Sequence, residues 1–238
     1  MYDSTEKFNG LRTKPRVTVL GIESSCDETA AAVVVNGREI KSNVIASQVP
    51  IHRRFGGVVP EVASRNHTMA VGNVVDEALK NAGVTLSDVD AIAVTYGAGL
   101  VGALLVGVTA AKALSYATGI PLVKVNHIEG HVAANFAAFP ELEPPFLALV
   151  ASGGHTLILD VAGYNDYRCL GSTRDDAIGE AFDKTARLLG LPYPGGPEID
   201  RLAKKGKNNI VFFHDKKSVN DDFSLSYSGL KTAVVNYI

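Results

Sequence analysis

The chain has 238 residues, of which 46% are hydrophobic and 20% charged, and its formal net charge is −2. A chain of this size can bury a sizeable core, as one large domain or two smaller ones. The near-neutral charge excludes nucleic-acid binding through an overall basic surface, so such binding needs local basic patches or partner proteins. The two cysteines, Cys26 and Cys169, lie far apart, which favours a reducing cytosol over a disulfide scaffold.

The N-terminal segment, residues 1–16, is predicted to be a mobile tail because it is polar and mixed in charge. It also lacks the apolar stretch of a signal peptide. Two β-rich runs follow, Val17–Ile22 and Ala30–Val35, and the second ends at the hairpin-type turn Asn36-Gly37. The loop between them, residues 23–29, carries hydroxyls, small residues and three carboxylates. Such a loop can bind phosphate, metal-bound water or a ribose, and the alternative is a solvated turn.

The segment from Ser47 to His67 is the densest cationic stretch of the N-terminal half. Its basic residues are His52, Arg53, Arg54, Arg65 and His67. Two interpretations of this stretch remain open: its basic side chains contact RNA phosphates, or they are simply exposed to solvent. Glycines and Pro60 in its second half indicate a shaped loop before a helix from Glu61 to Lys80, which Gly83 would end.

A run of twenty-one residues without charge, Ala91–Ala111, is long enough to suggest a transmembrane helix. Its glycines favour a buried strand from Asp90 to Tyr96, a glycine turn, and a buried helix from Leu100 to about Thr118. The glycine turn at the helix N-terminus can bind an anion or simply allow close packing. The strand–helix alternation predicts an α/β architecture with parallel pairing.

Two of the six histidines, His127 and His131, follow the next apolar run. If a helix begins near Asn126, a spacing of four places both imidazoles on one face, one turn apart. This spacing suits two ligands of one metal ion, and a pair of surface histidines is the alternative. Glu129 lies roughly 200° around the helix from His127, facing away, which excludes the zinc-peptidase arrangement of that motif.

After a proline-rich break, residues 141–145, the plan of residues 17–35 repeats. The strand Phe146–Val150, the small-residue loop 151–156 and the strand Leu157–Val161 indicate a duplicated nucleotide-binding fold with two lobes. The second loop is the better phosphate cradle because Gly153 and Gly154 allow the backbone to approach a ligand closely.

The remaining residues predict three helices and one strand. Thr173 and Asp176 resemble a capping box before a strongly amphipathic helix. On this helix the spacing alone makes Asp183 a partner of Arg187 in a surface ion pair. A tight loop leads into a helix near Pro197. Residues 223–227 alternate as a half-buried strand would, and a helix begins near Ser228. The chain stops in mid-pattern at Ile238, which suggests a truncation.

Several long strings together resemble one family. They are GIESSCDET, FGGVVPEVASRNH, GALLVG, NHIEGH, SGGHT, STRDDAIGEAFDKTARLLGLPYPGGPEID and SYSGLKTAV. They resemble the TsaD/Gcp family of bacterial tRNA threonylcarbamoyladenosine transferases, which is related to the KEOPS catalytic subunit. The resemblance runs from about Val17 to Ile238. It implies an actin-like fold of the actin, sugar-kinase and Hsp70 class, with residues 17–143 as the first lobe and 144–238 as an incomplete second lobe.

The resemblance also implies a function. Family members transfer threonylcarbamoyl from threonylcarbamoyl-AMP to the exocyclic amine of the adenosine beside the anticodon, in tRNAs that read codons beginning with A. It further implies a cytoplasmic protein, not bound to membranes, with a TsaB-type paralogue and a TsaE-type ATPase as partners. The paralogue is expected to pair with the first lobe near the helix that starts at Glu61.

The site residues follow from the same resemblance. His127 and His131 match the family's metal ligands for one divalent ion, usually iron or zinc. Asp183 matches the residue that holds the ribose. The adenylate-binding loop and further nucleotide contacts match Val150, Ala151, Ser152, Gly153, Gly154, Gly196 and Asp200.

The sequence departs from the family at three points. Ala98 and Ala151 replace a common proline and valine. The family's aspartate ligand and a nucleotide-binding asparagine lie in a C-terminal segment of about 100 residues that these 238 residues lack. We therefore expect this chain alone to bind metal and nucleotide poorly and to transfer little. The competing interpretations are a metalloprotease, a label the family once carried, and a non-catalytic scaffold like the TsaB paralogue.

Overall fold

The computed structural model describes residues 5–207 and 223–237. The chain forms two compact units, Met1–Leu142 and Glu143–Ile238. The division falls within the proline-containing segment 141–145. Each unit has its own β-sheet, and the units are described separately below.

Unit 1 is built on a five-stranded mixed sheet in the order β3-β2-β1-β4-β5. Strands β1 and β2 pair antiparallel, as do β2 and β3, whereas β1, β4 and β5 are parallel neighbours. The parallel pairing expected from the strand–helix alternation is confirmed. The strands are β1 Thr18–Glu23, β2 Glu28–Val35, β3 Glu39–Ser47, β4 Ala91–Gly97 and β5 Leu122–Asn126.

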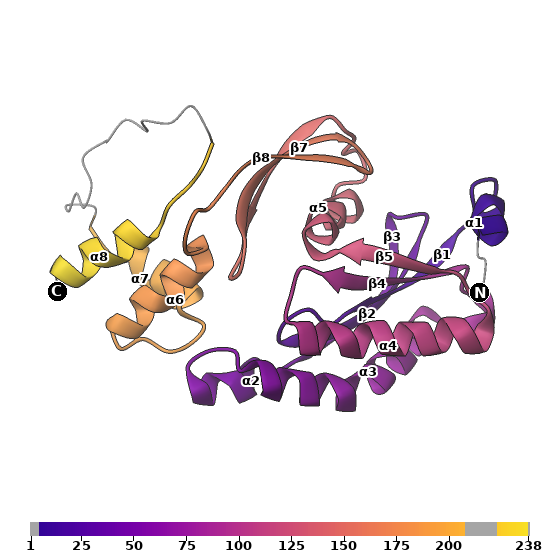
Figure 1. Cartoon of the computed structure of the whole chain (residues 1–238), viewed down its shortest axis with the longest axis horizontal. Coiled ribbons are helices and arrows are strands. Elements are labelled where there is room, and N and C mark those ends of the chain that lie inside the picture. Colours follow the sequence, from indigo (N-terminus) through magenta and orange to yellow (C-terminus); the bar gives the residue numbers. More distant parts are fainter. Residues whose placement is uncertain (1–4, 208–222, 238) are drawn as a thin grey trace. The chain divides into compact units, whose positions relative to one another are not determined.

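Two long helices cover one face of this sheet, α3 (Pro60–Ala82) and α4 (Val101–Thr118). They lie side by side below the sheet in Figure 1, and α5 (His127–Ala138) lies on the opposite side. Because successive strand residues face opposite sides, one set of strand side chains packs on these helices. This core contains Leu20, Ile22, Val33, Val74, Ala78, Leu79, Ile92 and Val94.

The uncharged run that raised the membrane question forms β4, a glycine-containing turn and α4, as expected. In the described part of the chain α4 is the one helix long and apolar enough to cross a membrane, by length and composition only. In the structure it packs against α3 and β4.

The structure differs from the sequence predictions at the N-terminus and at β3. Residues Thr5–Leu11, assigned to a mobile tail, form helix α1, and residues 1–4 of that tail lie outside the described residues. Strand β3 was not predicted, because its residues are mostly exposed and lack a clear alternation. The Asn36-Gly37 turn has positive φ at both residues and joins β2 to β3. Short helical turns at α2 Val49–His52, Arg53–Phe55 and Leu86–Asp88 complete the unit.

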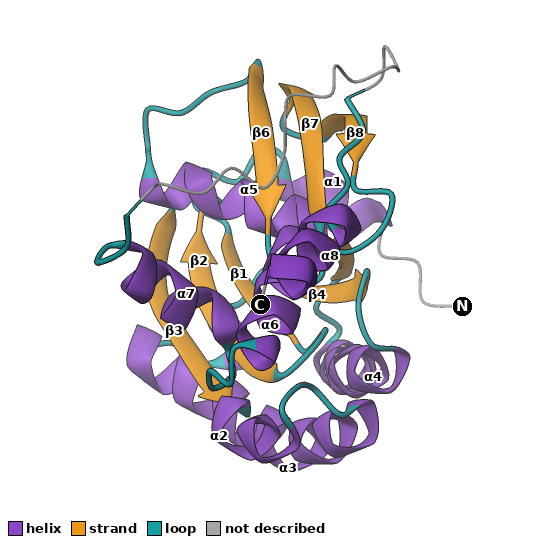
Figure 2. Ribbon diagram, turned by 90° about the vertical axis from the view of Figure 1, so that its left-hand side faces the viewer, coloured by secondary structure: helices purple, strands orange, loops and turns teal. Residues whose placement is uncertain are grey.

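Unit 2 begins with the antiparallel sheet β6-β7-β8, whose strands are neighbours in Figure 2. They span β6 Phe146–Ala151, β7 Thr156–Gly163 and β8 Asp166–Ser172. Three helices follow, α6 Ile178–Leu188, α7 Gly195–Ala203 and α8 Ser228–Tyr237. Helix α6 packs on both α7 and α8.

Two predictions in unit 2 were wrong. Helix α6 begins at Ile178 with Ala177 as its N-cap, so Thr173 does not cap it. The Thr173 hydroxyl instead donates to the Asp176 carbonyl within the preceding turn, at 2.7 Å. Residues 223–227 were expected to form a strand, but in the described part of the chain they make one isolated parallel bridge, between Leu225 and Thr173.

Candidate functional site

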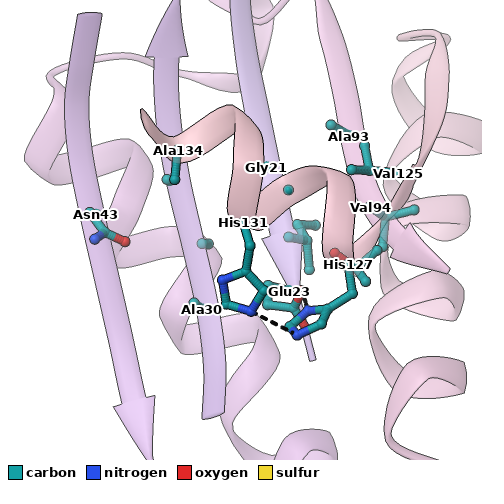
Figure 3. A pocket seen from close by; sticks show the side chains of 15 residues that line it. Gly21, Glu23, Ala30, Asn43, Ala93, Val94, Val125, His127, His131 and Ala134 are labelled. Carbon is teal, nitrogen blue, oxygen red and sulfur yellow. Dashed lines mark hydrogen bonds and ion pairs between the residues drawn. The ribbon is translucent and has the colours of Figure 1, made fainter. Parts of the chain in front are cut away.

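The two histidines of the predicted metal pair meet at the start of α5. The side chain of Asn126 caps this helix by accepting a hydrogen bond from the Ile128 amide at 2.9 Å. The cap places His127 at the first helical position and His131 one turn later. Their Nε2 atoms lie 3.0 Å apart, with the rings edge to face at 79° (Figure 3). The sequence prediction of one shared helix face is confirmed.

This geometry fits a single metal ion. Imidazole nitrogens bind zinc at about 2.0–2.1 Å, and two of them on a tetrahedral ion lie about 3.3 Å apart. The separation of 3.0 Å between the Nε2 atoms is close to that value. Neutral imidazole suits zinc, iron and other transition metals.

A carboxylate holds the other nitrogen of His127. Glu23, the last residue of β1, places Oε2 3.1 Å from His127 Nδ1, and the Ser25 hydroxyl lies at the same distance from that nitrogen. Burial alone would raise the pKa of Glu23, but hydrogen bonds from His127, Ser25 and Thr95 together lower it to about 2. The carboxylate is therefore ionised at neutral pH.

Desolvation also acts on His131. It lowers the pKa of this imidazole, and the neighbouring His127 lowers it further, whereas Glu23 opposes the shift. The neutral form that a metal requires is thereby favoured. Among residues 5–207 and 223–237, no cluster of three or more His, Cys, Asp or Glu side chains could hold a metal ion. The described site therefore groups two candidate ligands, His127 and His131.

The pair borders a cavity of about 390 Å³ in unit 1, between α5 and the sheet face turned away from α3 and α4. Figure 3 shows both imidazoles beside it, with small side chains along its walls. Most of the lining is apolar, and it includes Gly21, Ala30, Ala32, Ala93, Gly130 and Ala134. Glu129 is exposed and does not line this cavity. The exclusion of a zinc-peptidase arrangement therefore stands.

The serine hydroxyls of the loop between β1 and β2 form hydrogen bonds within unit 1. Ser24 is fully buried, and its hydroxyl donates to the Ala103 carbonyl and accepts from the Gly107 amide, at 2.9 and 3.2 Å. The Ser25 hydroxyl contacts His127, and its carbonyl accepts from the Leu100 amide. The loop thus ties α4 and α5 to the ends of the strands.

Two histidines counted in the cationic stretch are structural. His52 and His67 are fully buried. His67 bonds the Thr29 hydroxyl at 2.7 Å and the Cys26 carbonyl at 2.9 Å, and His52 bonds the Gln48 side chain at 3.2 Å. Of the basic residues in this stretch, only the arginines are therefore exposed to solvent. The sequence analysis had counted the two buried imidazoles among the surface cations.

The predicted nucleotide residues lie in unit 2. In the loop after β6, the Ser152 hydroxyl accepts from the His155 amide, and a Cβ atom added at Gly153 or Gly154 would meet nothing within 4 Å. The loop packs on the start of α6, where the Gly179 amide donates to the Ser152 carbonyl at 3.2 Å. Before the loop, Val150 is buried and Ala151 exposed.

The other predicted contacts lie on α6 and α7. Asp183 accepts a hydrogen bond from the Gly195 amide at 2.6 Å, which places it beside Gly196 at the start of α7. This contact could not be predicted from spacing, which had paired Asp183 with Arg187. Asp200 forms an exposed ion pair with Lys204 at 2.8 Å. The structure thus brings Asp183 of α6 close to Gly196 of α7, and Asp200 lies further along α7.

Comparison with known proteins identifies close relatives. Residues 39–238 match the family described as tRNA N6-adenosine threonylcarbamoyltransferase, TsaD. A protein with this description from Clostridium perfringens is 60% identical over 220 residues, which cover 92% of this chain and 65% of the relative. One from Clostridium novyi is 62% identical over 227 residues, covering 93% and 65%. The chain thus spans about 65% of the length of these curated relatives.

A solved structure supports the fold. Component A of (R)-2-hydroxyglutaryl-CoA dehydratase from Acidaminococcus fermentans matches with a TM-score of 0.51 at 13% identity, over 94% of this chain and 68% of that one. The likeness concerns the fold alone. The predicted actin-like α/β class is confirmed.

Proposed function

Because the chain belongs to the tRNA N6-adenosine threonylcarbamoyltransferase family, we propose that it serves the synthesis of threonylcarbamoyladenosine in tRNA. In this proposal threonylcarbamoyl passes from threonylcarbamoyl-AMP to the exocyclic amine of the adenosine beside the anticodon, in tRNAs reading codons that begin with A. The observation that carries it is the identity of about 60% to such transferases over more than nine tenths of the chain.

The histidine pair supports a metal-dependent step. His127 and His131 would hold one divalent ion, iron or zinc, through their Nε2 atoms, which lie 3.0 Å apart. Such an ion would act as a Lewis acid on a phosphate or carbamoyl oxygen. Glu23 and Ser25 hold the far side of the His127 ring, and Asn126 fixes the start of the helix. The protein thus supplies orientation.

The glycine loop of unit 2 would bind the adenylate. The Gly153 and Gly154 positions are open and exposed, so their backbone amides can approach a phosphate closely. Asp183 would hold the ribose. Its present contact with the Gly195 amide places the carboxylate at the start of α7. Gly196 and Asp200 complete the proposed nucleotide contacts.

Partner binding is proposed for the face formed by α3 and α4. These helices pack on each other and expose large apolar side chains. Met69 is 78% exposed, Val101 74% and Leu105 58%. Large apolar side chains exposed on two packed helices favour a protein interface there. We assign this face to a TsaB-type paralogue, with a TsaE-type ATPase as a further partner, in the cytoplasm.

The function is tested by nucleoside analysis of tRNA. Depletion of the protein in its own cells should remove threonylcarbamoyladenosine from hydrolysed tRNA, and the full-length gene should restore it. A gene carrying His131→Ala should not. Unchanged levels of the modified nucleoside after depletion would overturn the proposal. The 238-residue chain alone is expected to restore little, because its described residues include no group of three or more side chains that could hold a metal ion.

A further inference from the structure

The Nδ1 side of the His127 ring, opposite the proposed ion, contacts Glu23 and Ser25, which are distant in sequence. Glu23 ends β1 and His127 begins α5, 104 residues later. The Oε2 atom of Glu23 and the Ser25 hydroxyl each lie 3.1 Å from Nδ1 of the imidazole. The second oxygen of Glu23 accepts from the Ser25 amide, and Thr95 also bonds the carboxylate. Glu23 is therefore fixed before any ligand arrives.

This arrangement determines where the proton of neutral His127 resides. An ionised carboxylate can only accept a hydrogen bond, so its contact with Nδ1 requires the proton on that nitrogen. The Nε2 atom then keeps its lone pair, which points at His131 Nε2, 3.0 Å away. Without the carboxylate, both tautomers of a neutral imidazole would be accessible.

We propose that Glu23 is a positioning residue, which holds His127 as the Nδ1–H tautomer and directs its Nε2 lone pair toward a divalent metal ion. Glu23 acts through the ring and is not itself a ligand of that ion, because it contacts the opposite ring nitrogen. Carboxylates behind metal-bound histidines have this effect elsewhere, fixing the tautomer and strengthening the ligand. The inference rests on the proposed function only for the identity of the bound species.

The tautomer can be measured in the metal-free protein. The full 238-residue chain is labelled with ¹⁵N-histidine, and long-range ¹H–¹⁵N spectra identify which nitrogen of His127 is protonated. We expect Nδ1 in the unaltered chain and a mixture of both tautomers in Glu23→Ala. Glu23→Gln, which keeps the shape of the side chain, provides a second variant in case the alanine variant does not fold. Urea unfolding checks both.

Metal affinity provides the second measurement. Zinc is titrated at neutral pH in competition with a chromogenic chelator, with the same substitutions placed in the full-length protein, because the 238 residues alone are expected to bind metal poorly. Removing the carboxylate should weaken zinc binding about 10- to 100-fold, the usual effect of losing such a partner. The matched control is Glu129→Gln, which removes the same charge from the exposed side of α5. Its affinity should stay within about twofold of the unaltered chain.

The outcomes separate this inference from the proposed function. A proton on Nε2 in the unaltered chain, or an unchanged tautomer and zinc affinity in the Glu23 variants, would overturn the role of Glu23. A Glu23-dependent tautomer without any zinc binding would support the orientation of His127 and contradict the metal site. Glu23-dependent zinc binding with no effect of protein depletion on tRNA would uphold the inference and contradict the transferase.

Discussion

Gly99 lies against the backbone of Ser25, and a Cβ atom at position 99 would stand 2.6 Å from the Ser25 carbonyl oxygen. Gly99 also has φ of 154°, a conformation that side chains other than glycine disfavour. The turn between β4 and α4 is thus packed directly on the loop that supports His127. A side chain cannot be added at this position without moving one of the two segments.

Gly99→Ala should therefore destabilise the chain by about 1–3 kcal/mol, through overpacking and backbone strain. Urea unfolding followed by circular dichroism measures the change. The control is Gly72→Ala on α3, where an added Cβ meets nothing within 4 Å. This variant should gain up to about 1 kcal/mol from helix propensity. Equal stability of Gly99→Ala and the unaltered chain would contradict the close packing.

The buried His67 should be needed for the first loop. His67→Ala leaves a cavity and removes the partners of the Thr29 hydroxyl and Cys26 carbonyl, so a loss of about 2–4 kcal/mol is expected. Thr29→Val keeps the volume and removes one hydrogen bond, so it should lose only about 1 kcal/mol. Denaturant unfolding of both variants provides the comparison. A larger loss for Thr29→Val than for His67→Ala would contradict this account.

Asp175 should make stability depend on pH. Its carboxylate accepts from the Ser226 and Ser228 hydroxyls and from the Tyr227 and Ser228 amides. These bonds, led by that of Ser226, lower its pKa although desolvation opposes them. Because the pKa is lower in the folded state, the stabilisation is present above the unfolded value of about 3.9 and is lost as pH falls through the folded value.

Asp175→Asn should accordingly be less stable than the unaltered chain at pH 7, and the difference should shrink below about pH 4. The side chain is exposed, so solvent screening keeps the effect small. Unfolding curves at several pH values measure it. Asp76→Asn, at an exposed i,i+4 pair with Lys80, should change stability by no more than about 0.5 kcal/mol at pH 7. A difference for Asp175→Asn that grows on acidification would have the wrong sign.

The apolar face of α3 and α4 should be needed for partner binding. Met69→Asp and Leu105→Asp place a charge on exposed positions, so they should leave folding intact and abolish co-elution with a TsaB-type paralogue. Tyr116→Asp, at the C-terminal end of α4 and 92% exposed, is the control and should still bind. Co-elution of all three variants would place the partner elsewhere.

The sequence predicted the elements whose signals are local. The apolar run before Asn126 and the spacing of His127 and His131 were sufficient to predict the strand and, for a helix beginning near Asn126, the shared face. Strand β3 was missed because it is largely exposed, so its side chains do not alternate clearly between apolar and polar. His52 and His67 were misjudged because burial depends on tertiary packing.

The contact between Glu23 and His127 was missed because the two residues lie 104 positions apart. A signal for it did exist. Glu23 directly follows an apolar strand, and carboxyl ends of neighbouring parallel strands meet at one edge of a sheet. Since β1, β4 and β5 are parallel neighbours, this edge gathers Glu23, Thr95 and Asn126 around His127. Predicting it required the strand order, which the sequence alone left open.

The most direct test of the central claim is the metal content of the protein purified without oxygen. Mass spectrometry of the metal, with protein quantified in parallel, should find one iron or zinc ion bound through His127 and His131 in the full-length protein. His131→Ala should lose it, and His155→Ala, which alters a histidine of unit 2, should retain it. Full metal content in His131→Ala would contradict the assignment of this pair as the metal site.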